Sequence, residues 1–167
     1  SLIAYASVAA AQGPIHSLCF RDGCNLTDQV GSMDATLVDG ATCEPGSGIV
    51  CHGDGGYADL VDVAFGGAMT FAVWARWDSL NAWSRVFDFG DGPNANNIAL
   101  SNYEASSFIC PFAMTDAGDW VGFKGTAGII GLESWTHVVF TIDADALRLS
   151  QDGALLGTTD GGLLANL

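Results

Sequence analysis

Apolar and polar residues alternate along most of this chain with a period of two, the pattern of β-strands that are buried on one face. The clearest case is 70–77, where Phe71 and Val73 fall on one face of the strand and Ala72 and Trp74 on the other. The same pattern predicts further strands at 15–20, 35–38, 48–51, 57–61, 85–89, 97–101, 108–114, 120–123, 135–142, 146–150 and 154–158.

Residues that favour turns separate these strands at intervals of about ten residues. The turn signals are Asp22-Gly23, Pro45-Gly46, Gly66-Gly67, Gly92-Pro93 and Asp152-Gly153. The last pair lies between two alternating runs, as expected for a two-residue hairpin turn. We find no amphipathic helix longer than a turn or two. So many short strands in one chain predict an all-β fold, in which two antiparallel sheets pack as a sandwich.

The composition is that of one globular, acidic domain. The chain has 167 residues, 49% of them hydrophobic, which is enough to bury a core. The formal net charge is −14, from 5 Lys and Arg against 19 Asp and Glu. This balance excludes nucleic acids and anionic membrane surfaces as partners, because both attract clustered cations. Apolar runs such as 2–11 are too short for a transmembrane span of about 20 residues.

We divide the chain after residue 13. Residues 14–167 are expected to form the sandwich. Residues 1–13 are apolar and small, but they contain neither Met nor a basic segment. They are consistent with the remnant of a signal peptide, with an interdomain linker or with an added strand.

Cysteine content points to an oxidising compartment. The five cysteines, at 19, 24, 43, 51 and 110, are many for a reduced cytosolic domain, and none forms the CxxC pair of a structural zinc site. Disulfides are therefore expected. Asn25-Leu26-Thr27 adds an N-glycosylation acceptor at Asn25. Together these features predict an extracellular or cell-surface location.

Five segments follow one another in an order that is typical of one family: 48–60 (GIVCHGDGGYADL), 69–78 (MTFAVWARWD), 85–90 (RVFDFG), 135–143 (WTHVVFTID) and 147–157 (LRLSQDGALLG). They resemble the laminin G-like domains of the concanavalin A-like jelly-roll superfamily, over roughly residues 14–160. The resemblance implies a two-sheet antiparallel jelly-roll that binds glycans or proteins outside the cell, sometimes through calcium, without catalysis. In two respects the chain departs from the family: Cys51 replaces an aromatic core residue, and the final strand of the family has no counterpart before Leu167.

The same resemblance implies a disulfide between Cys24 and Cys43. The segments Arg21-Asp22-Gly23-Cys24 and Ala41-Thr42-Cys43 match a pair of bonded cysteines in extracellular members. Cys19 and Cys51 each lie on a predicted strand and are expected to pair with one another. Cys110 is then left over, either buried and inert or bonded to another chain.

The strand at 15–20 is expected to lack a neighbour. In laminin G-like sandwiches the first and last strands lie side by side, and the last strand is the one without a counterpart here. An unpaired strand edge invites pairing by another strand. Three segments could fill the place: a continuation of the protein past Leu167, the apolar stretch 2–11 folding back, or a strand of a neighbouring chain.

Calcium is the one candidate ion, although no cofactor is expected to be required. The loop 88–97 carries several oxygen ligands of the kind that calcium prefers, and Asp88, Asp91, Asn94 and Asn96 are the candidates. The alternative is that these residues serve only as turn formers, because Asp and Asn are common in loops for conformational reasons.

Two tryptophans are candidates for ligand stacking. Trp83 lies in a polar turn, and Trp120 follows another, so both are expected at the surface. Trp74, Trp77 and Trp135 lie on regular alternating strands and are assigned to the core.

An enzyme is not expected. Glycoside hydrolysis needs two carboxyl groups on one sugar, yet the three glutamates, Glu44, Glu104 and Glu133, are far apart in sequence. No nucleophile-elbow sequence accompanies the histidines. The sequence therefore predicts a non-catalytic extracellular binding or adhesion module for a glycan or protein. The alternative is a structural building block of a surface coat or filament, held by neighbouring chains.

Overall fold

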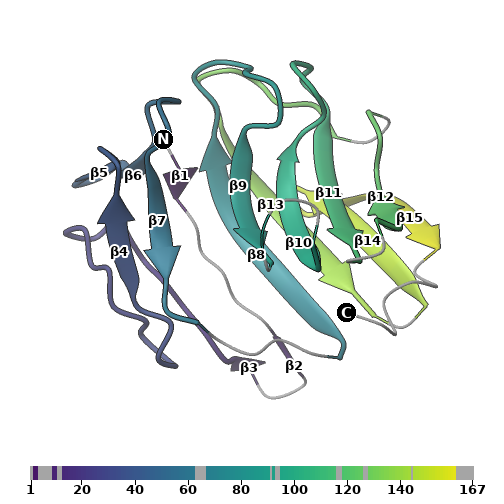
Figure 1. Cartoon of the computed structure of the whole chain (residues 1–167), viewed down its shortest axis with the longest axis horizontal. Helices are drawn as coiled ribbons and strands as arrows, with labels where there is room; N and C mark the ends of the chain where they lie inside the picture. Colours follow the sequence, from purple (N-terminus) through teal and green to yellow (C-terminus); the bar gives the residue numbers. More distant parts are fainter. Residues whose placement is uncertain are drawn as a thin grey trace.

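The chain folds into antiparallel β-sheets stacked in two layers (Figure 1). The computed structural model describes residues 2–3, 9–10, 13–62, 67–90, 92, 95–115, 118–125, 128–143 and 145–160. Across these ranges no helix is present, and hence none with the length and apolar character to cross a membrane.

The larger sheet has the strand order β15-β14-β13-β8-β1-β6-β5. Its strands are β15 (Ala154–Asp160), β14 (Ala146–Gln151), β13 (Trp135–Ile142), β8 (Met69–Arg76), β1 (Leu2–Ile3), β6 (Gly48–Val50) and β5 (Thr42–Glu44). β8 and β13 pair over their full length, from Met69 opposite Ile142 to Arg76 opposite Trp135. Both strands alternate strictly, so this register places the apolar residues of both on the same face.

The second layer is built from two separate sheets. One has the order β12 (Trp120–Gly122), β11 (Ile109–Met114), β10 (Asn97–Asn102) and β9 (Arg85–Phe89), and the other pairs β4 (Ala35–Val38) with β7 (Tyr57–Leu60). A short ladder joins β2 (Ala9–Ala10) to β3 (Gly13–Pro14). These layers confirm the predicted two-sheet antiparallel jelly-roll sandwich.

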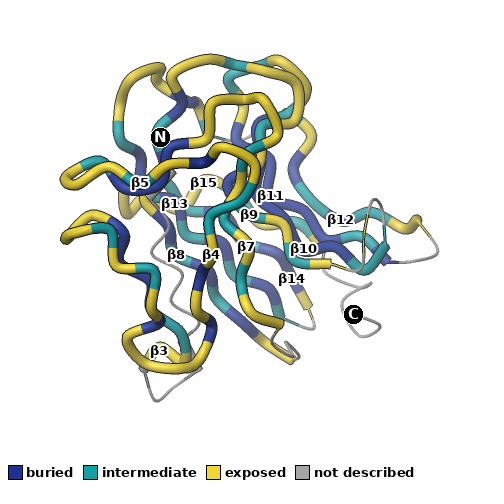
Figure 2. The backbone as a smooth tube through the Cα atoms, turned by 60° about the vertical axis from the view of Figure 1, so that its left-hand side comes forward, coloured by how far each residue is buried: buried dark blue, intermediate teal, exposed yellow. Residues whose placement is uncertain are grey.

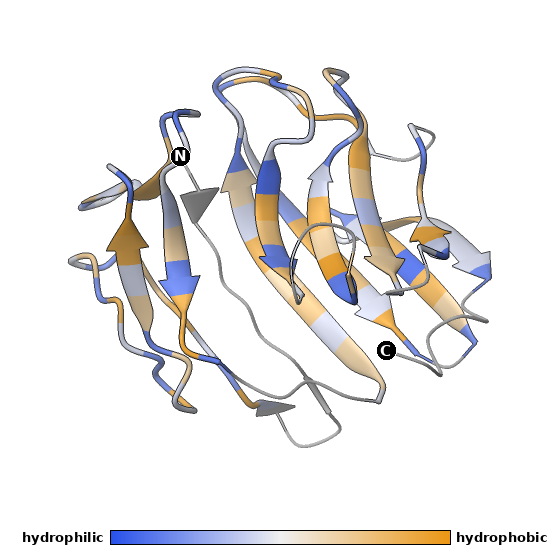
Figure 3. Ribbon diagram, viewed as in Figure 1, coloured by the Kyte–Doolittle hydropathy of each residue, from blue (hydrophilic) through white to orange (hydrophobic). Residues whose placement is uncertain are grey.

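The main core fills the space between the layers. Phe71 of β8 and Phe140 of β13 are almost fully buried, with ring centroids 5.7 Å apart. Phe87 of β9 stacks on both rings, at 5.0 Å from Phe71 and 6.2 Å from Phe140. Burial therefore concentrates along the central strands (Figure 2), which also carry the apolar residues drawn in orange in Figure 3.

The prediction of a strand at 15–20 is wrong, because residues 16–20 have no strand pairing. Leu18 and Phe20 are nevertheless buried, in a second core cluster that includes Ile49. β1 lies between β6 and β8, and its Leu2 pairs with both Ile49 and Ala75. A short segment from the start of the chain thus lies inside the larger sheet as an added strand.

The buried carboxylate of Asp28 holds part of the segment 16–20, which has no strand pairing. Asp28 accepts hydrogen bonds from the backbone N–H groups of Ser17 (2.8 Å), Val30 (3.1 Å) and Met33 (3.0 Å), and its Oδ2 lies 2.6 Å from Nδ1 of His16. Burial by itself would raise the pKa of Asp28, but these hydrogen bonds outweigh it and hold the pKa well below its usual range. A charged Asp28 therefore organises the irregular loop that covers the second core cluster.

The cysteines follow the predictions in part. The structure contains the Cys24–Cys43 disulfide implied by the resemblance, with a Cα–Cα distance of 5.6 Å. Closing this loop of about 20 residues stabilises the fold by roughly 3 kcal/mol in the chain-entropy model. The expected Cys19–Cys51 bond is wrong: both remain thiols, Cys19 buried and Cys51 exposed. The reason is that 16–20 does not form the strand that would bring the two side chains together.

Of the two alternatives expected for Cys110, the structure shows the first, a buried thiol. It lies on β11 opposite Ser101 of β10 and has no exposed surface. Burial raises its pKa to about 12, so the thiol stays protonated at neutral pH.

Candidate functional site

A groove opens in the second layer, where β7 and β9 face each other without pairing (Figure 1). Its volume is about 1350 Å³. In the described part of the chain, β7 is hydrogen-bonded only to β4 and β9 only to β10. The groove therefore separates two sheet edges that would otherwise form one continuous layer.

The floor of the groove is apolar. It is lined by the half-buried side chains of Phe87 and Phe89 of β9 and Leu60 of β7. Phe71 and Val73 of β8 border it but are almost fully buried. The rings of Phe71 and Phe89 stack with centroids 5.6 Å apart. In β7 and β8 the position of these side chains follows from alternation, since every second residue points to the interior of the sandwich. In β9 a register shift opposite Leu100 and Ser101 interrupts the alternation, and the neighbours Val86 and Phe87 both pack in the core.

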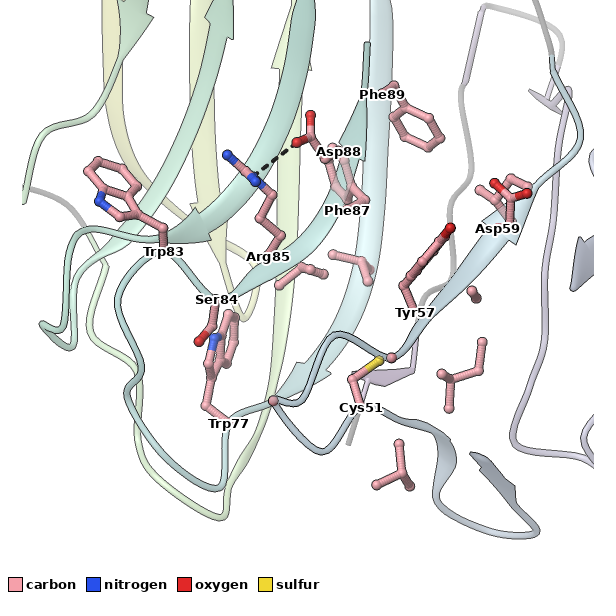
Figure 4. A pocket seen from close by; sticks show the side chains of 18 of the residues that line it. Cys51, Tyr57, Asp59, Trp77, Trp83, Ser84, Arg85, Phe87, Asp88 and Phe89 are labelled. Atoms are coloured by element: carbon pink, nitrogen blue, oxygen red, sulfur yellow. Dashed lines mark ion pairs between the residues drawn. The ribbon is translucent and has the colours of Figure 1, made fainter. Parts of the chain in front are cut away.

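The walls carry polar and aromatic side chains (Figure 4). On one wall, Tyr57 and Asp59 of β7 are exposed. On the other, Arg85 Nε lies 3.0 Å from Asp88 Oδ2, while Asp88 Oδ1 accepts a hydrogen bond of 2.8 Å from Asn97 Nδ2. Both oxygens of Asp88 are therefore engaged, whereas the side chain of Asp59 has no hydrogen bond or ion pair with any described residue.

Trp83 lies at the rim of this groove, 38% exposed. Its φ of 58° places it in a left-handed turn, and its ring meets the ring of Tyr103 edge-on at 5.2 Å. The buried side chain of Asn102 fixes the turn, accepting from Ser84 N (2.7 Å) and donating to Asn81 O (2.9 Å). The predicted surface tryptophan is thus held in place by a buried amide.

Trp120, the second candidate, lies elsewhere. It belongs to β12, at the far edge of the four-stranded sheet, and does not line the groove. Its ring stacks on Phe112 at 6.0 Å, and Lys124 Nζ lies 4.3 Å from the ring centroid. The structure therefore does not bring Trp83 and Trp120 together.

The candidate calcium ligands are described only in part. Asp91 and Asn94 lie outside the described residues, and Asp88 is already paired with Arg85 and Asn97. Among the described residues, no group of three or more His, Cys, Asp or Glu side chains is arranged to hold a metal ion. Calcium binding stays a prediction that the geometry does not favour at Asp88.

An exposed tryptophan that the sequence analysis assigned to the core lies on the outer face of the larger sheet. Trp74 is 41% exposed, and its ring packs against that of His137 of β13 in a tilted arrangement, with centroids 4.9 Å apart. Its assignment to the core is wrong, whereas Trp77 is buried as expected. The signal was present in the alternation, because Trp74 falls out of phase with the buried Phe71 and Val73.

The proposed glycosylation acceptor is accessible. Asn25 and Thr27 are both exposed, and Asn25 Oδ1 accepts a hydrogen bond of 3.0 Å from Thr27 N. The site follows directly on the disulfide-bonded Cys24. Modification of Asn25 remains a prediction.

Comparison with known proteins agrees with this architecture. The model of the laminin G-like family, described as concanavalin A-like lectin/glucanases superfamily, matches residues 52–165, about two thirds of the chain. No curated protein and no solved structure matches the chain. The matched region includes β7, β8 and β9, and so most of the groove. The chain therefore belongs to the laminin G-like family of the concanavalin A-like lectin/glucanase superfamily.

Proposed function

We propose that this chain is a non-catalytic extracellular binding module that holds a glycan or protein ligand in the groove between β7 and β9. The observation that carries the proposal is the groove itself, with its apolar floor and its rim of Tyr57, Asp59 and Trp83. A large concave site with an apolar lining and a few polar groups is the usual form of a binding site.

The carboxylates of the groove favour binding over hydrolysis. A glycosidase needs one carboxyl as general acid and a second as base or nucleophile, both directed at one sugar. Four aspartates line the groove: Asp59, Asp62, Asp78 and Asp88. Asp59 and Asp88 lie on opposite walls (Figure 4), Asp78 is paired with Arg76, and both oxygens of Asp88 are held by Arg85 and Asn97. A carboxylate engaged in this way is suited to ordering the wall rather than to exchanging protons.

An extracellular setting fits the covalent features. The Cys24–Cys43 disulfide persists in oxidising compartments, and the exposed Asn25 acceptor is used only on the secretory route. Because the chain carries a net charge of −14, it repels sulfated glycans, so neutral glycans are the expected carbohydrate ligands.

The experiment is a binding screen on arrays of neutral and sulfated glycans, with Trp83→Ala as the groove variant and Trp74→Ala as the matched control. Both side chains are exposed tryptophans, but only Trp83 lines the groove. We expect Trp83→Ala to weaken binding several-fold, up to about tenfold, as for an aromatic side chain that contacts the ligand at the rim, and Trp74→Ala to leave it unchanged. Loss of binding in Trp74→Ala alone would place the site on the outer face of the larger sheet and contradict the proposal.

A second candidate function, a building block of a surface assembly, is favoured by β15. This strand lies at the edge of the larger sheet, and Leu155 and Leu156 are 63% and 41% exposed. An apolar edge strand is a template for pairing with another chain.

Sedimentation over a wide concentration range tests this second function. We expect self-association that Leu155→Lys abolishes and that Leu132→Lys, at an exposed leucine off the edge strand, leaves intact. A chain that stays monomeric throughout argues against the building-block function.

A further inference from the structure

Trp83 has a backbone conformation that its residue type disfavours. Its φ of 58° lies in the left-handed region, where bulky side chains are rare. In the described part of the chain most such positions are glycine, and three of the others are Asp39, Asn96 and Asp152, whose residue types tolerate this conformation. A tryptophan at this position is strained, and the strain calls for a compensating interaction of its side chain.

Packing within the chain compensates this strain only in part. The side chain of Trp83 is 38% exposed and belongs to none of the buried core clusters. Within the described part of the chain, the aromatic ring that it meets is that of Tyr103, edge-on at 5.2 Å. The exposed part of the indole is therefore available to a ligand at the rim of the groove (Figure 4).

One buried amide holds the turn of Trp83 in this conformation. Asn102, which has no exposed surface, accepts a hydrogen bond from Ser84 N (2.7 Å) and donates one to Asn81 O (2.9 Å). It also donates to Glu104 O (2.7 Å), the carbonyl that accepts from the N–H of Trp83 (3.0 Å). Glu104 is itself left-handed, with a φ of 50°. The hydrogen bonds of Asn102 thus connect the two strained residues and the loops that carry them.

Tyr103 supports the ring of Trp83 and is itself fixed. Its backbone N–H donates to Phe108 O (3.0 Å), and its carbonyl accepts from Ser106 N (3.0 Å). Its ring lies against Gly125, where a Cβ atom would come within 3.2 Å of Tyr103 Cδ1. The pair of rings is therefore set in place before any ligand binds.

We propose that the exposed ring of Trp83 stacks on the apolar face of a sugar, and that Asn102 is the positioning residue that orders this ring in advance. This inference rests on the proposed binding function and deepens it, because it names the ligand class, a neutral glycan, and the residue that prepares the contact. A side chain that is ordered before binding loses less conformational entropy when the ligand arrives, and the affinity rises accordingly.

The polar surroundings of the ring favour a sugar as its ligand. The exposed side chains of Asn81 and Glu104 lie in the same two loops as Trp83 and Tyr103 and have no hydrogen bond or ion pair with a described residue. A pyranose has an apolar C–H face bordered by hydroxyl groups. Stacking on the indole and hydrogen bonding to the neighbouring side chains would satisfy both parts of such a ligand.

The first test separates ligand contact from packing. Trp83→Asn removes the ring and relieves the strain, because asparagine tolerates the left-handed region. We expect the denaturation midpoint not to fall, while binding to the neutral glycans of the array weakens several-fold. A fall of the midpoint as large as that of a core variant would show that Trp83 serves packing, and would overturn the proposal.

The second test removes the positioning hydrogen bonds. Asn102→Asp keeps the acceptor for Ser84 N but turns a carboxylate toward the carbonyl oxygens of Asn81 and Glu104. We expect the ring of Trp83 to become mobile on the nanosecond timescale and the affinity for neutral glycans to fall about three- to tenfold. If Asn102→Asp does not fold, Asn102→Ser provides the smaller, measurable change.

Time-resolved fluorescence anisotropy measures the mobility of the ring. Each variant is compared with the same chain carrying Trp83→Phe, so that the difference reports on this one of the five tryptophans. Ser106→Ala is the matched control, because it removes a hydrogen bond to Tyr103 O from the same hairpin without touching the amide of Asn102. It is expected to leave both the mobility of Trp83 and the affinity unchanged.

A double-mutant cycle shows whether Asn102 acts through Trp83. In a chain that already carries Trp83→Ala, we expect Asn102→Asp to cause no further loss of affinity. A further loss as large as in the wild-type chain would mean that Asn102 affects binding by another route, and would overturn its assignment as the positioning residue.

The outcomes separate this inference from the proposed function. If the ring of Trp83 is as mobile in the wild-type chain as in Asn102→Asp, the positioning role is wrong and the binding function of the groove stands. Glycan binding that Tyr57→Ala weakens and Trp83→Asn does not would likewise overturn this inference alone. If no neutral glycan binds while a protein ligand does, the sugar is the wrong ligand class, and if neither binds at the groove, both proposals are wrong.

Discussion

Replacing Phe140 with alanine is expected to lower the free energy of unfolding by about 3–5 kcal/mol, the range for deleting a large aromatic side chain from a well-packed core. Phe140 has no exposed surface and contacts the rings of Phe71 and Phe87, which join the two layers. The cavity left by alanine would separate these rings. Denaturant unfolding monitored by circular dichroism gives the change.

Val139→Ala is the matched control for Phe140→Ala. Val139 is the next residue on β13, but it points to the outer face of the sheet and is only half-buried. Its replacement is expected to lower stability by about 1 kcal/mol or less. Equal losses in the two variants would contradict the assignment of the inner face. If Phe140→Ala does not fold, Phe140→Leu provides the smaller, measurable change.

Asp28→Ala is expected to lower the free energy of unfolding by roughly 3–5 kcal/mol, because buried donors lose a charged acceptor. The backbone N–H groups of Ser17, Val30 and Met33 would be left without this acceptor, as would His16. Asp34→Ala is the control, because it removes a nearby carboxylate that accepts only from Asp28 N among the hydrogen bonds of this loop. Equal effects of the two variants would mean that Asp28 does not organise the loop.

The same carboxylate makes stability depend on pH. Its pKa is held well below the value of about 3.9 that it has in the unfolded chain, so its contribution is complete above pH 4 or so. As the pH falls below that value, the unfolded state takes up the proton first and the contribution is lost. We expect wild-type stability to decrease below about pH 4, and to decrease less steeply in Asp28→Asn. Identical pH profiles would contradict this assignment.

The pKa of Asp143 is also lowered, so this residue also contributes to the loss of stability at low pH, in wild type and in Asp28→Asn alike. The hydrogen bond from Arg148 is the main cause that lowers its pKa, with the backbone N–H groups of Asp145 and Ala146 adding to it. The comparison of Asp28→Asn with wild type removes this shared contribution. The difference between the two pH profiles therefore reports on Asp28.

Much of the sandwich was predictable because its information is local. The period of two in 70–77 and 135–142 is a property of neighbouring residues, and these segments became the paired strands β8 and β13. The Asp152-Gly153 turn likewise joins β14 to β15. The resemblance of five ordered segments added the jelly-roll and the Cys24–Cys43 bond, which periodicity alone does not indicate.

One error arose where residues are buried without belonging to a paired strand. Residues 15–20 carry the apolar residues of a strand, and Leu18 and Phe20 are indeed buried. Their backbone, however, is ordered partly by the side chain of Asp28, which accepts a hydrogen bond from Ser17 N, 11 residues earlier in the chain. Trp74 was assigned to the interior because it is an aromatic residue on a central strand. The alternation of β8, however, places it on the outer face, and it is exposed.

The sequence by itself determined most of the strands, among them 70–77 and 135–142, and the apolar face of each, since both depend on the spacing of side chains along one segment. Only the tertiary structure decided that Leu2–Ile3 lies between β6 and β8, and that β7 and β9 face each other across a groove. Strand order depends on which distant segments pair, and a sheet edge is exposed only when no segment takes the neighbouring place. No local sequence pattern indicates which distant segments pair or which sheet edge stays exposed, because nearly every residue offers the same backbone N–H and C=O groups.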